Sequence, residues 1–160
     1  MIEQMVAADW PEVREIYEQG IATGDATFET EAPSWESWND AHLSVCRLVS
    51  RRDGVVAGWA ALTPFSKRPV YRGVAEASVY VAEASRSAGV GSALMQGVID
   101  RSEAAGIWTL LAKIFPENAA SLAMAARFGF RTVGVLERIG QQNGAWRDVI
   151  LLQRRSVFLL

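Results

Sequence analysis

The chain has 160 residues, 50% of them apolar, and its 16 basic and 18 acidic side chains give a formal net charge of −2. This length predicts one domain over residues 1–160, and the small net charge predicts no nucleic acid or anionic membrane as partner. Cys46 is the only cysteine, which excludes an internal disulfide and a cysteine-based metal cluster, and no metal is expected. Because the chain shows no targeting signal and no apolar run long enough to span a bilayer, we expect a soluble cytoplasmic protein.

The first half of the chain predicts an apolar start, two helices and three strands. Pro11 and Glu12 follow Asp9 as in the first turn of a helix, and apolar residues then recur at helical spacing as far as Gly20. A second, short helix is expected over residues 34–42. Runs rich in valine and alanine predict strands at 45–50, 55–63 and 74–81, with a hairpin turn at 51–54.

The second half alternates helices and strands. Helical spacing predicts a long helix over residues 90–105 that Gly106 closes, and a shorter one over 118–128. Strands are expected at 110–114, 133–136 and 146–152, with a turn at 143–144 before the last. This order predicts an α/β fold with a mixed sheet, helices on its faces and parallel pairing across the helical crossovers.

A glycine-rich turn joins the strand at 74–81 to the long helix. Gly89 and Gly91 allow backbone amides to approach a ligand closely, and amides that open a helix bind phosphate groups. Arg86 adds a cation for a phosphate, whereas the alternative is a tight strand-to-helix turn without a ligand. The dinucleotide fingerprint fits badly, because Leu94 stands where its third glycine belongs, and the P-loop is excluded because its lysine is missing.

The pattern Arg86-x-x-Gly89-x-Gly91, between a strand and a long helix, resembles the acetyl-coenzyme A (acetyl-CoA) signature of the GCN5-related N-acetyltransferase (GNAT) family. Residues 118–130 resemble the second cofactor segment of that family, and the resemblance covers essentially the whole chain. It implies the GNAT fold, a mixed and mostly antiparallel sheet of about seven strands with four helices on its faces.

Three further stretches, residues 26–30, 65–81 and 144–153, resemble the branch that acetylates phosphinothricin and methionine sulfoximine. The resemblance implies direct transfer of an acetyl group from acetyl-CoA, the co-substrate, to the α-amino group of a small amino acid-like amine, and it implies a homodimer. Two alternatives stay open. One is acetylation of a protein N-terminus or lysine, and the other is a non-catalytic sensor that binds acyl-CoA.

In the family, the strand that ends at residue 81 pairs with the pantetheine arm, and a main-chain amide near Val79 or Val81 can stabilise the oxyanion. The pyrophosphate lies on the amides of residues 87–92, and Asn118 reaches the arm from the other side. The resemblance therefore implies a set of cofactor-binding residues: Val79, Tyr80, Val81, Arg86, Ser87, Ala88, Gly89, Val90, Gly91, Ser92, Asn118 and Ser121.

Glu76 matches the position of the family's general base, and Glu29 and Asp148 are the competing carboxylates. Nucleophilic catalysis has little support, because Cys46 lies in an apolar run that predicts burial and His42 has no obvious partner.

The general acid is not assigned by the sequence. Ala125 occupies the position where many family members carry a tyrosine or, in this branch, a histidine that protonates the departing thiol. Either coenzyme A leaves as a thiolate, since a thiol pKa is about 8.5, or water or Tyr80 assists.

Five residues are predicted to bind the substrate: Phe28, Arg68, Tyr71, Arg72 and Ser78. Arginine suits bidentate capture of a carboxylate or phosphinate, whereas the alternative for Arg68 and Arg72 is a solvated loop. Arg72 precedes Glu76 by four positions, so an extended chain would place both on one face, unless a bend at Gly73 intervenes. Phe28 is expected to contact the apolar stem of the substrate, and a core position is the alternative.

Overall fold

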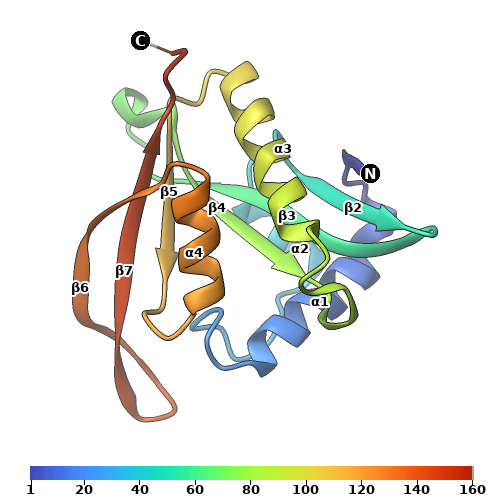
Figure 1. Ribbon diagram of the computed structural model, residues 1–160, viewed down its shortest axis with the longest axis horizontal. Helices are drawn as coiled ribbons and strands as arrows, with labels where there is room; N and C mark the ends of the chain where they lie inside the picture. Colours follow the sequence, from blue (N-terminus) through green and yellow to red (C-terminus); the bar gives the residue numbers. More distant parts are fainter. Residues whose placement is uncertain (160) are drawn as a thin grey trace.

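A computed structural model, which describes residues 1–159, shows one seven-stranded sheet with helices on both faces (Figure 1). The strands are β1 (Ile2–Gln4), β2 (Leu48–Arg52), β3 (Val55–Pro64), β4 (Val74–Val81), β5 (Thr109–Ile114), β6 (Arg131–Gln142) and β7 (Ala145–Arg155). The helices are α1 (Trp10–Ala22), α2 (Trp35–Ala41), α3 (Val90–Ala104) and α4 (Ala119–Arg127). The strand order is β1-β2-β3-β4-β5-β7-β6, with β4 and β5 parallel and every other neighbouring pair antiparallel. The predicted fold class is confirmed.

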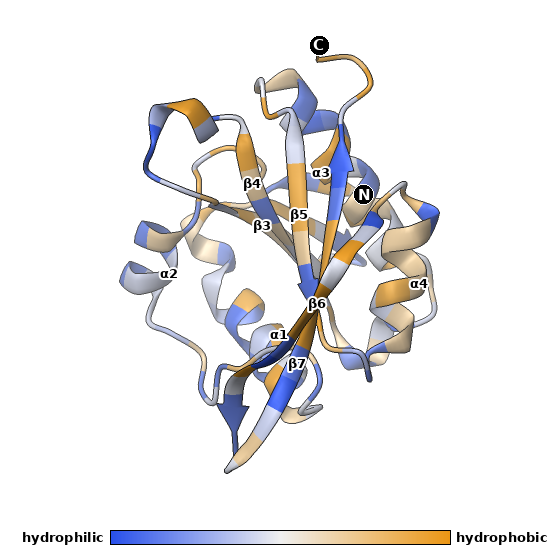
Figure 2. Cartoon of the chain, turned by 90° about the vertical axis from the view of Figure 1, so that its left-hand side faces the viewer, coloured by the Kyte–Doolittle hydropathy of each residue, from blue (hydrophilic) through white to orange (hydrophobic). Residues whose placement is uncertain are grey.

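The two faces of the sheet carry separate apolar clusters. Helices α3 and α4 cover one face and α1 and α2 the other (Figure 2). Because side chains alternate along a strand, β4 turns Ala75, Val79 and Val81 toward α3 and its apolar cluster. Glu76 and Tyr80 point to the opposite face, which α1 and α2 cover. Strand β4 therefore presents its polar side chains on the α1 and α2 side of the sheet.

Strands β4 and β5 separate after a short stretch of pairing (Figure 1). Their parallel register ends at the pair Glu76 and Leu111, whereas β4 continues beside β3 as far as Val81. The Ala82 N–H donates to the Ala57 carbonyl across β3 at 2.8 Å, so even-numbered residues of β4 turn their backbone groups toward β3. The backbone N–H and C=O groups of Val79 therefore face the gap between β4 and β5, as do those of Val81.

Three strands, β2, β6 and β7, differ from the sequence-based expectation by more than one residue at an end. Strand β2 begins at Leu48 and not at residue 45, because Cys46 has a φ of 62°, outside the β region. The predicted burial of Cys46 is confirmed, and burial raises the pKa of its thiol to about 11. Strands β6 and β7 are much longer than predicted, because they form a ribbon that extends past the other strands (Figure 2). A bulge interrupts β6, where the Arg138 N–H donates to Asp148 Oδ1 at 2.7 Å.

Strand β6 is an edge of the sheet, and its exposed side chains include Val133, Val135 and Ile139. The expected homodimer stays a prediction. Within residues 1–159, no helix has the length and hydrophobicity needed to cross a membrane. The same part of the chain contains no group of three or more His, Cys, Asp or Glu side chains placed to hold a metal ion.

Candidate active site

Two cavities lie beside the gap between β4 and β5. The first, which we call the aromatic cavity, has a volume of about 740 Å³ and lies on the α1 and α2 side of the sheet. The second, the helix-end cavity, has a volume of about 900 Å³ and lies between the N-termini of α3 and α4. Ala26 and Tyr80 are the two residues that line both cavities. The two cavities therefore adjoin at Ala26 and Tyr80, beside the gap between the strands.

The helix-end cavity contains unpaired backbone donors. Gly89 precedes α3 and has a φ of 82°. After residue 86, the first N–H that donates to a backbone carbonyl is that of Ala93, which donates to the Gly89 carbonyl at 3.1 Å. Among the described residues, none of the N–H groups of 87–92 has a protein acceptor. Arg86 and Arg127 also line this cavity. Free amides at the positive end of a helix dipole, together with two guanidinium groups, fit a pyrophosphate.

Most of the predicted cofactor-binding residues line the helix-end cavity. These are Val79, Tyr80, Val81, Arg86, Ser87, Gly89, Val90, Gly91, Ser92, Asn118 and Ser121. Ala88 does not line it. Sequence reasoning did not select Arg127, whose Nη2 donates to Ser92 Oγ at 3.4 Å, although the last turn of a helix is where a basic residue is common.

The loop after α1 forms the wall shared by the two cavities. Asn118 caps α4 by accepting the Ser121 N–H at 3.2 Å, and its Nδ2 donates to the Asp25 carbonyl at 3.2 Å. Arg147 of β7 binds the same loop, with its Nη2 2.8 Å from Asp25 Oδ1. Gln142 Nε2 donates to the Thr27 carbonyl at 2.9 Å. Asn118 therefore positions the loop as well as lining the cavity.

The aromatic cavity is named for seven ring side chains in its lining: Tyr17, Phe28, Trp38, His42, Trp59, Tyr80 and Phe115. The ring of Tyr80 lies parallel to that of Trp59 at 4.7 Å and stacks on Tyr17 at 5.0 Å. Gly20 of α1 permits this packing, because a Cβ there would lie 2.6 Å from the Tyr80 ring. Burial raises the pKa of Tyr17 and, still more, that of Tyr80, and the nearby charge of Glu29 adds to both shifts.

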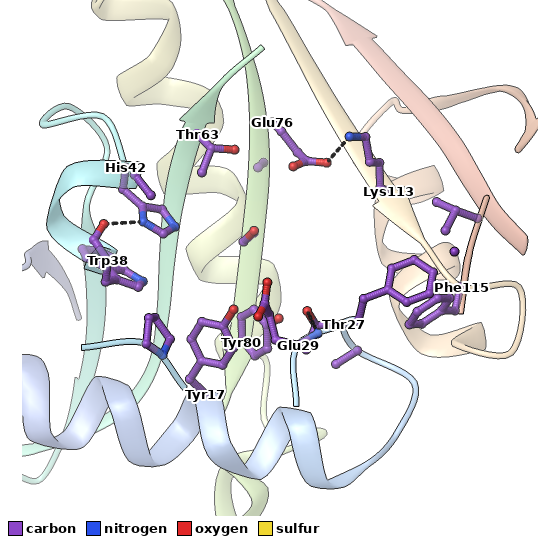
Figure 3. A pocket seen from close by; sticks show the side chains of 18 of the residues that line it. Tyr17, Thr27, Glu29, Trp38, His42, Thr63, Glu76, Tyr80, Lys113 and Phe115 are labelled. Carbon is purple, nitrogen blue, oxygen red and sulfur yellow. Dashed lines mark hydrogen bonds and ion pairs between the residues drawn. The ribbon is translucent and has the colours of Figure 1, made fainter. Parts of the chain in front are cut away.

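His42 ends α2 at the wall of the aromatic cavity (Figure 3). Its Nδ1 donates to the Trp38 carbonyl at 2.7 Å, and its ring stacks on Trp38 at a centroid distance of 4.1 Å. Burial lowers the pKa of His42, and although the bond to Trp38 opposes this, the charge of Arg47 lowers the pKa further. His42 is therefore a neutral ring at neutral pH. The indole Nε1 atoms of Trp38 and Trp59 are buried without a partner among the described residues.

Glu76 points into the aromatic cavity where β4 and β5 separate (Figure 3). Its Oε1 lies 3.5 Å from Lys113 Nζ of β5, and its side chain is 29% exposed against 55% for the lysine. Of the two competing carboxylates, Glu29 lines the cavity, whereas Asp148 does not and instead accepts the Arg138 N–H of the β6 bulge. Sequence reasoning did not select Lys113, and the only available signal was a lone lysine in an otherwise apolar strand.

The structure brings two of the five predicted substrate-binding residues, Phe28 and Ser78, into the aromatic cavity. Arg68 and Arg72 lie outside it, with their guanidinium groups 5.6 Å from the Tyr71 ring and 5.4 Å from the Trp108 ring. Arg72 does not share a face with Glu76, because residues 69–71 form a 3-10 turn and β4 begins only at Val74, so the chain bends before the strand, which is the alternative that the sequence left open. A role of Arg68, Tyr71 and Arg72 in binding substrate stays a prediction.

Comparison with known proteins defines the class. The sequence model of the Acetyltransferase (GNAT) family matches residues 7–130, so the chain belongs to this family and is an acetyltransferase. It is 36% identical over 154 residues to phosphinothricin N-acetyltransferase of Alcaligenes faecalis, covering 91% of this chain and 77% of that protein. It is 30% identical over 152 residues to L-methionine sulfoximine/L-methionine sulfone acetyltransferase of Pseudomonas paraeruginosa, covering 91% of this chain and 88% of that protein.

A solved structure agrees with these sequence relatives. The phosphinothricin acetyltransferase (Pat) of Sinorhizobium meliloti, in complex with AcCoA, matches with a TM-score of 0.88 and 28% identity over 97% of this chain and 87% of that one. The protein is therefore an acetyl-CoA-dependent N-acetyltransferase of the phosphinothricin acetyltransferase type.

Proposed function

We propose that the protein acetylates the α-amino group of a small amino acid-like substrate and that Glu76 is the general base. The observation that carries this proposal is the meeting of two cavities at the gap between β4 and β5, where Glu76 projects into the aromatic cavity. The amine enters on the aromatic side, and acetyl-CoA supplies the acetyl group as a thioester from the helix-end side.

Residues of the helix-end cavity account for cofactor binding in this proposal. The free amides of residues 87–92 bind the pyrophosphate, and Arg86 and Arg127 neutralise its charge. The backbone groups of Val79 and Val81 face the gap without a strand partner, so they suit the amide groups of an extended pantetheine arm. A backbone N–H of Val79 or Val81 stabilises the thioester carbonyl oxygen, which becomes negative during transfer of the acetyl group.

Glu76 has a defined chemical task, because an ammonium group has no lone pair to attack with. The carboxylate takes the proton of the substrate ammonium, directly or through one water. The free amine then forms the new N–C bond as the thioester C–S bond breaks, and the nitrogen loses a second proton. One of the two protons ends on the coenzyme thiol and the other in solvent, so the reaction balances without an acyl-enzyme.

Tyr80 is the residue best placed to assist departure of the sulfur. It is the one hydroxyl-bearing residue that lines both cavities, and burial raises its pKa, so the phenol stays protonated at neutral pH. The position that carries the acid in many family members cannot serve here, because Ala125 is an alanine packed into the core. Tyr80 is therefore proposed as a hydrogen-bond donor to the leaving thiolate.

The test of this function is Glu76→Gln, which keeps the shape of the side chain and removes the proton acceptor. We expect kcat to fall by roughly 10² to 10⁴ and the residual rate to rise with pH as more amine becomes neutral by itself. Calorimetry should show nearly unchanged acetyl-CoA affinity. Glu29→Gln is the matched comparison, and a large loss there with none at Glu76 would move the base to Glu29. Failure to release thiol with any amine, despite tight binding of acetyl-CoA, would support the non-catalytic sensor instead.

A further inference from the structure

The charges that line the aromatic cavity are few. They are two carboxylates, Glu29 and Glu76, and one ammonium, Lys113, and no other Asp, Glu, Lys or Arg belongs to its described lining. With His42 neutral, the sum is one positive against two negative charges, or −1. Phosphinothricin, for which the Alcaligenes faecalis relative is named, carries a phosphinate in addition to its carboxylate. This cavity provides no second cation for such a group, so like-charge repulsion opposes its binding.

The pair formed by Glu76 and Lys113 is complementary to a zwitterion. The two opposite charges lie 3.5 Å apart on neighbouring strands, and an α-amino acid carries an ammonium and a carboxylate on one carbon. With the ammonium beside Glu76, where the base must be, the carboxylate falls beside Lys113. The lysine side chain is 55% exposed, so its ion pair with Glu76 is weak and exchanges readily for a substrate carboxylate.

The rest of the cavity then determines which side chain fits. Trp38 and His42 lie on the opposite side of Glu76 from Lys113, and Tyr17 and Tyr80 form the floor below (Figure 3). A substrate held by Glu76 and Lys113 therefore directs its side chain toward these four rings. Aromatic rings pack well against one another in stacked or edge-to-face contacts, so these rings suit a substrate side chain that is itself an uncharged ring.

We propose that the preferred substrate is an α-amino acid with a large, uncharged aromatic side chain and that Lys113 binds its carboxylate. This inference rests on the proposed function, because it assumes that Glu76 marks the place of the reacting amine. It assigns to Lys113 the role that the sequence had predicted for Arg68 and Arg72.

The experiment compares kcat/KM for L-phenylalanine, phenethylamine, which lacks the carboxylate, and phosphinothricin. We expect wild-type kcat/KM to be roughly tenfold or more higher for L-phenylalanine than for phosphinothricin. Lys113→Met should lower kcat/KM for L-phenylalanine by roughly 10- to 100-fold, the loss expected when a bond to a charged group is removed, and that for phenethylamine far less. Lys67→Met is the matched control, because Lys67 is the other lysine of the chain and lies exposed outside the cavity.

Calorimetric titration of L-phenylalanine into the protein with coenzyme A supplies a readout without turnover, and its affinity should fall in Lys113→Met and not in Lys67→Met. Equal losses on L-phenylalanine and phenethylamine would show that Lys113 acts only through Glu76 and would overturn its role. Preference for phosphinothricin would overturn the substrate class while the proposed function stands. If no amine is acetylated, the proposed function itself fails.

Discussion

Gly20 of α1 offers a direct test of whether the position of Tyr80 controls activity. In Gly20→Ala, the added Cβ would lie 2.6 Å from Cε2 and 2.7 Å from Cδ2 of the Tyr80 ring. Reaching the 3.4 Å of ordinary contact from 2.6 Å requires a displacement of 0.8 Å. The ring cannot yield freely, because it stacks on Trp59 and Tyr17.

Two effects on stability oppose each other in Gly20→Ala. Alanine is the better helix former by about 1 kcal/mol, whereas overpacking costs about 1–3 kcal/mol, so the net change lies between about zero and 2 kcal/mol of destabilisation. Activity should suffer more, because Tyr80 lines both cavities and a misplacement of this size reduces rates by roughly 10- to 100-fold.

The assay pairs a denaturant unfolding curve with steady-state thiol release for each variant. Gly97→Ala in α3 is the matched control, because its Cβ would meet Leu48 and Ile2 at 3.1 and 3.2 Å, and neither residue lines a cavity. We expect Gly97→Ala to retain wild-type kcat/KM. A folded Gly20→Ala protein with full activity would refute the reasoning that the Tyr80 ring must hold its position.

Two further predictions concern the cofactor and pH. In Gly91→Val, a Cβ 3.3 Å from Met124 Sδ and 3.4 Å from Val81 Cγ2 places the valine methyls in the helix-end cavity. Calorimetry should therefore show coenzyme A affinity reduced by well over tenfold in a folded protein, and unchanged affinity would reject the pyrophosphate site. Burial lowers the pKa of His42, so below about pH 6.5 the unfolded chain binds a proton that the folded chain does not. The free energy of unfolding should consequently decrease as the pH is lowered from about 6.5 to the folded pKa of His42. His42→Asn keeps a donor for the Trp38 carbonyl but cannot bind the proton. Unfolding curves at about pH 7.5 and about pH 5.5 should therefore show a smaller loss of stability in this variant than in the wild type. Identical slopes in the two proteins would contradict that assignment.

The sequence was sufficient where periodicity and turn chemistry act locally. The alternation of β4 places Glu76 and Tyr80 on one face, and the glycines after Arg86 place free amides at the start of α3. The position of Lys113 beside Glu76 was not predictable in the same way, because this contact depends on the pairing of β5 with β4, which covers only three residue pairs.

Arg72 shows the opposite failure, in which a local pattern was overridden. Its offset from Glu76 predicted a shared face only if the chain between them is extended, but the turn at 69–71 delays the strand and Arg72 stacks over Trp108 instead. Strand β6 was predicted too short for a related reason. In a two-stranded ribbon exposed on both sides, the alternation that marks a half-buried strand is weak, as the exposed Val133 and Val135 show.

The linings of the two cavities have only Ala26 and Tyr80 in common. Substitutions at well-separated sites with no shared partners usually have additive effects on free energy. Changes on the α2 side of the aromatic cavity, for example at Ser37 or Ala41, should therefore combine additively with changes around α3 and leave coenzyme A affinity intact. The preference of this enzyme for its amine substrate can accordingly evolve, or be selected in the laboratory, without changes to the helix-end cavity proposed to bind acetyl-CoA.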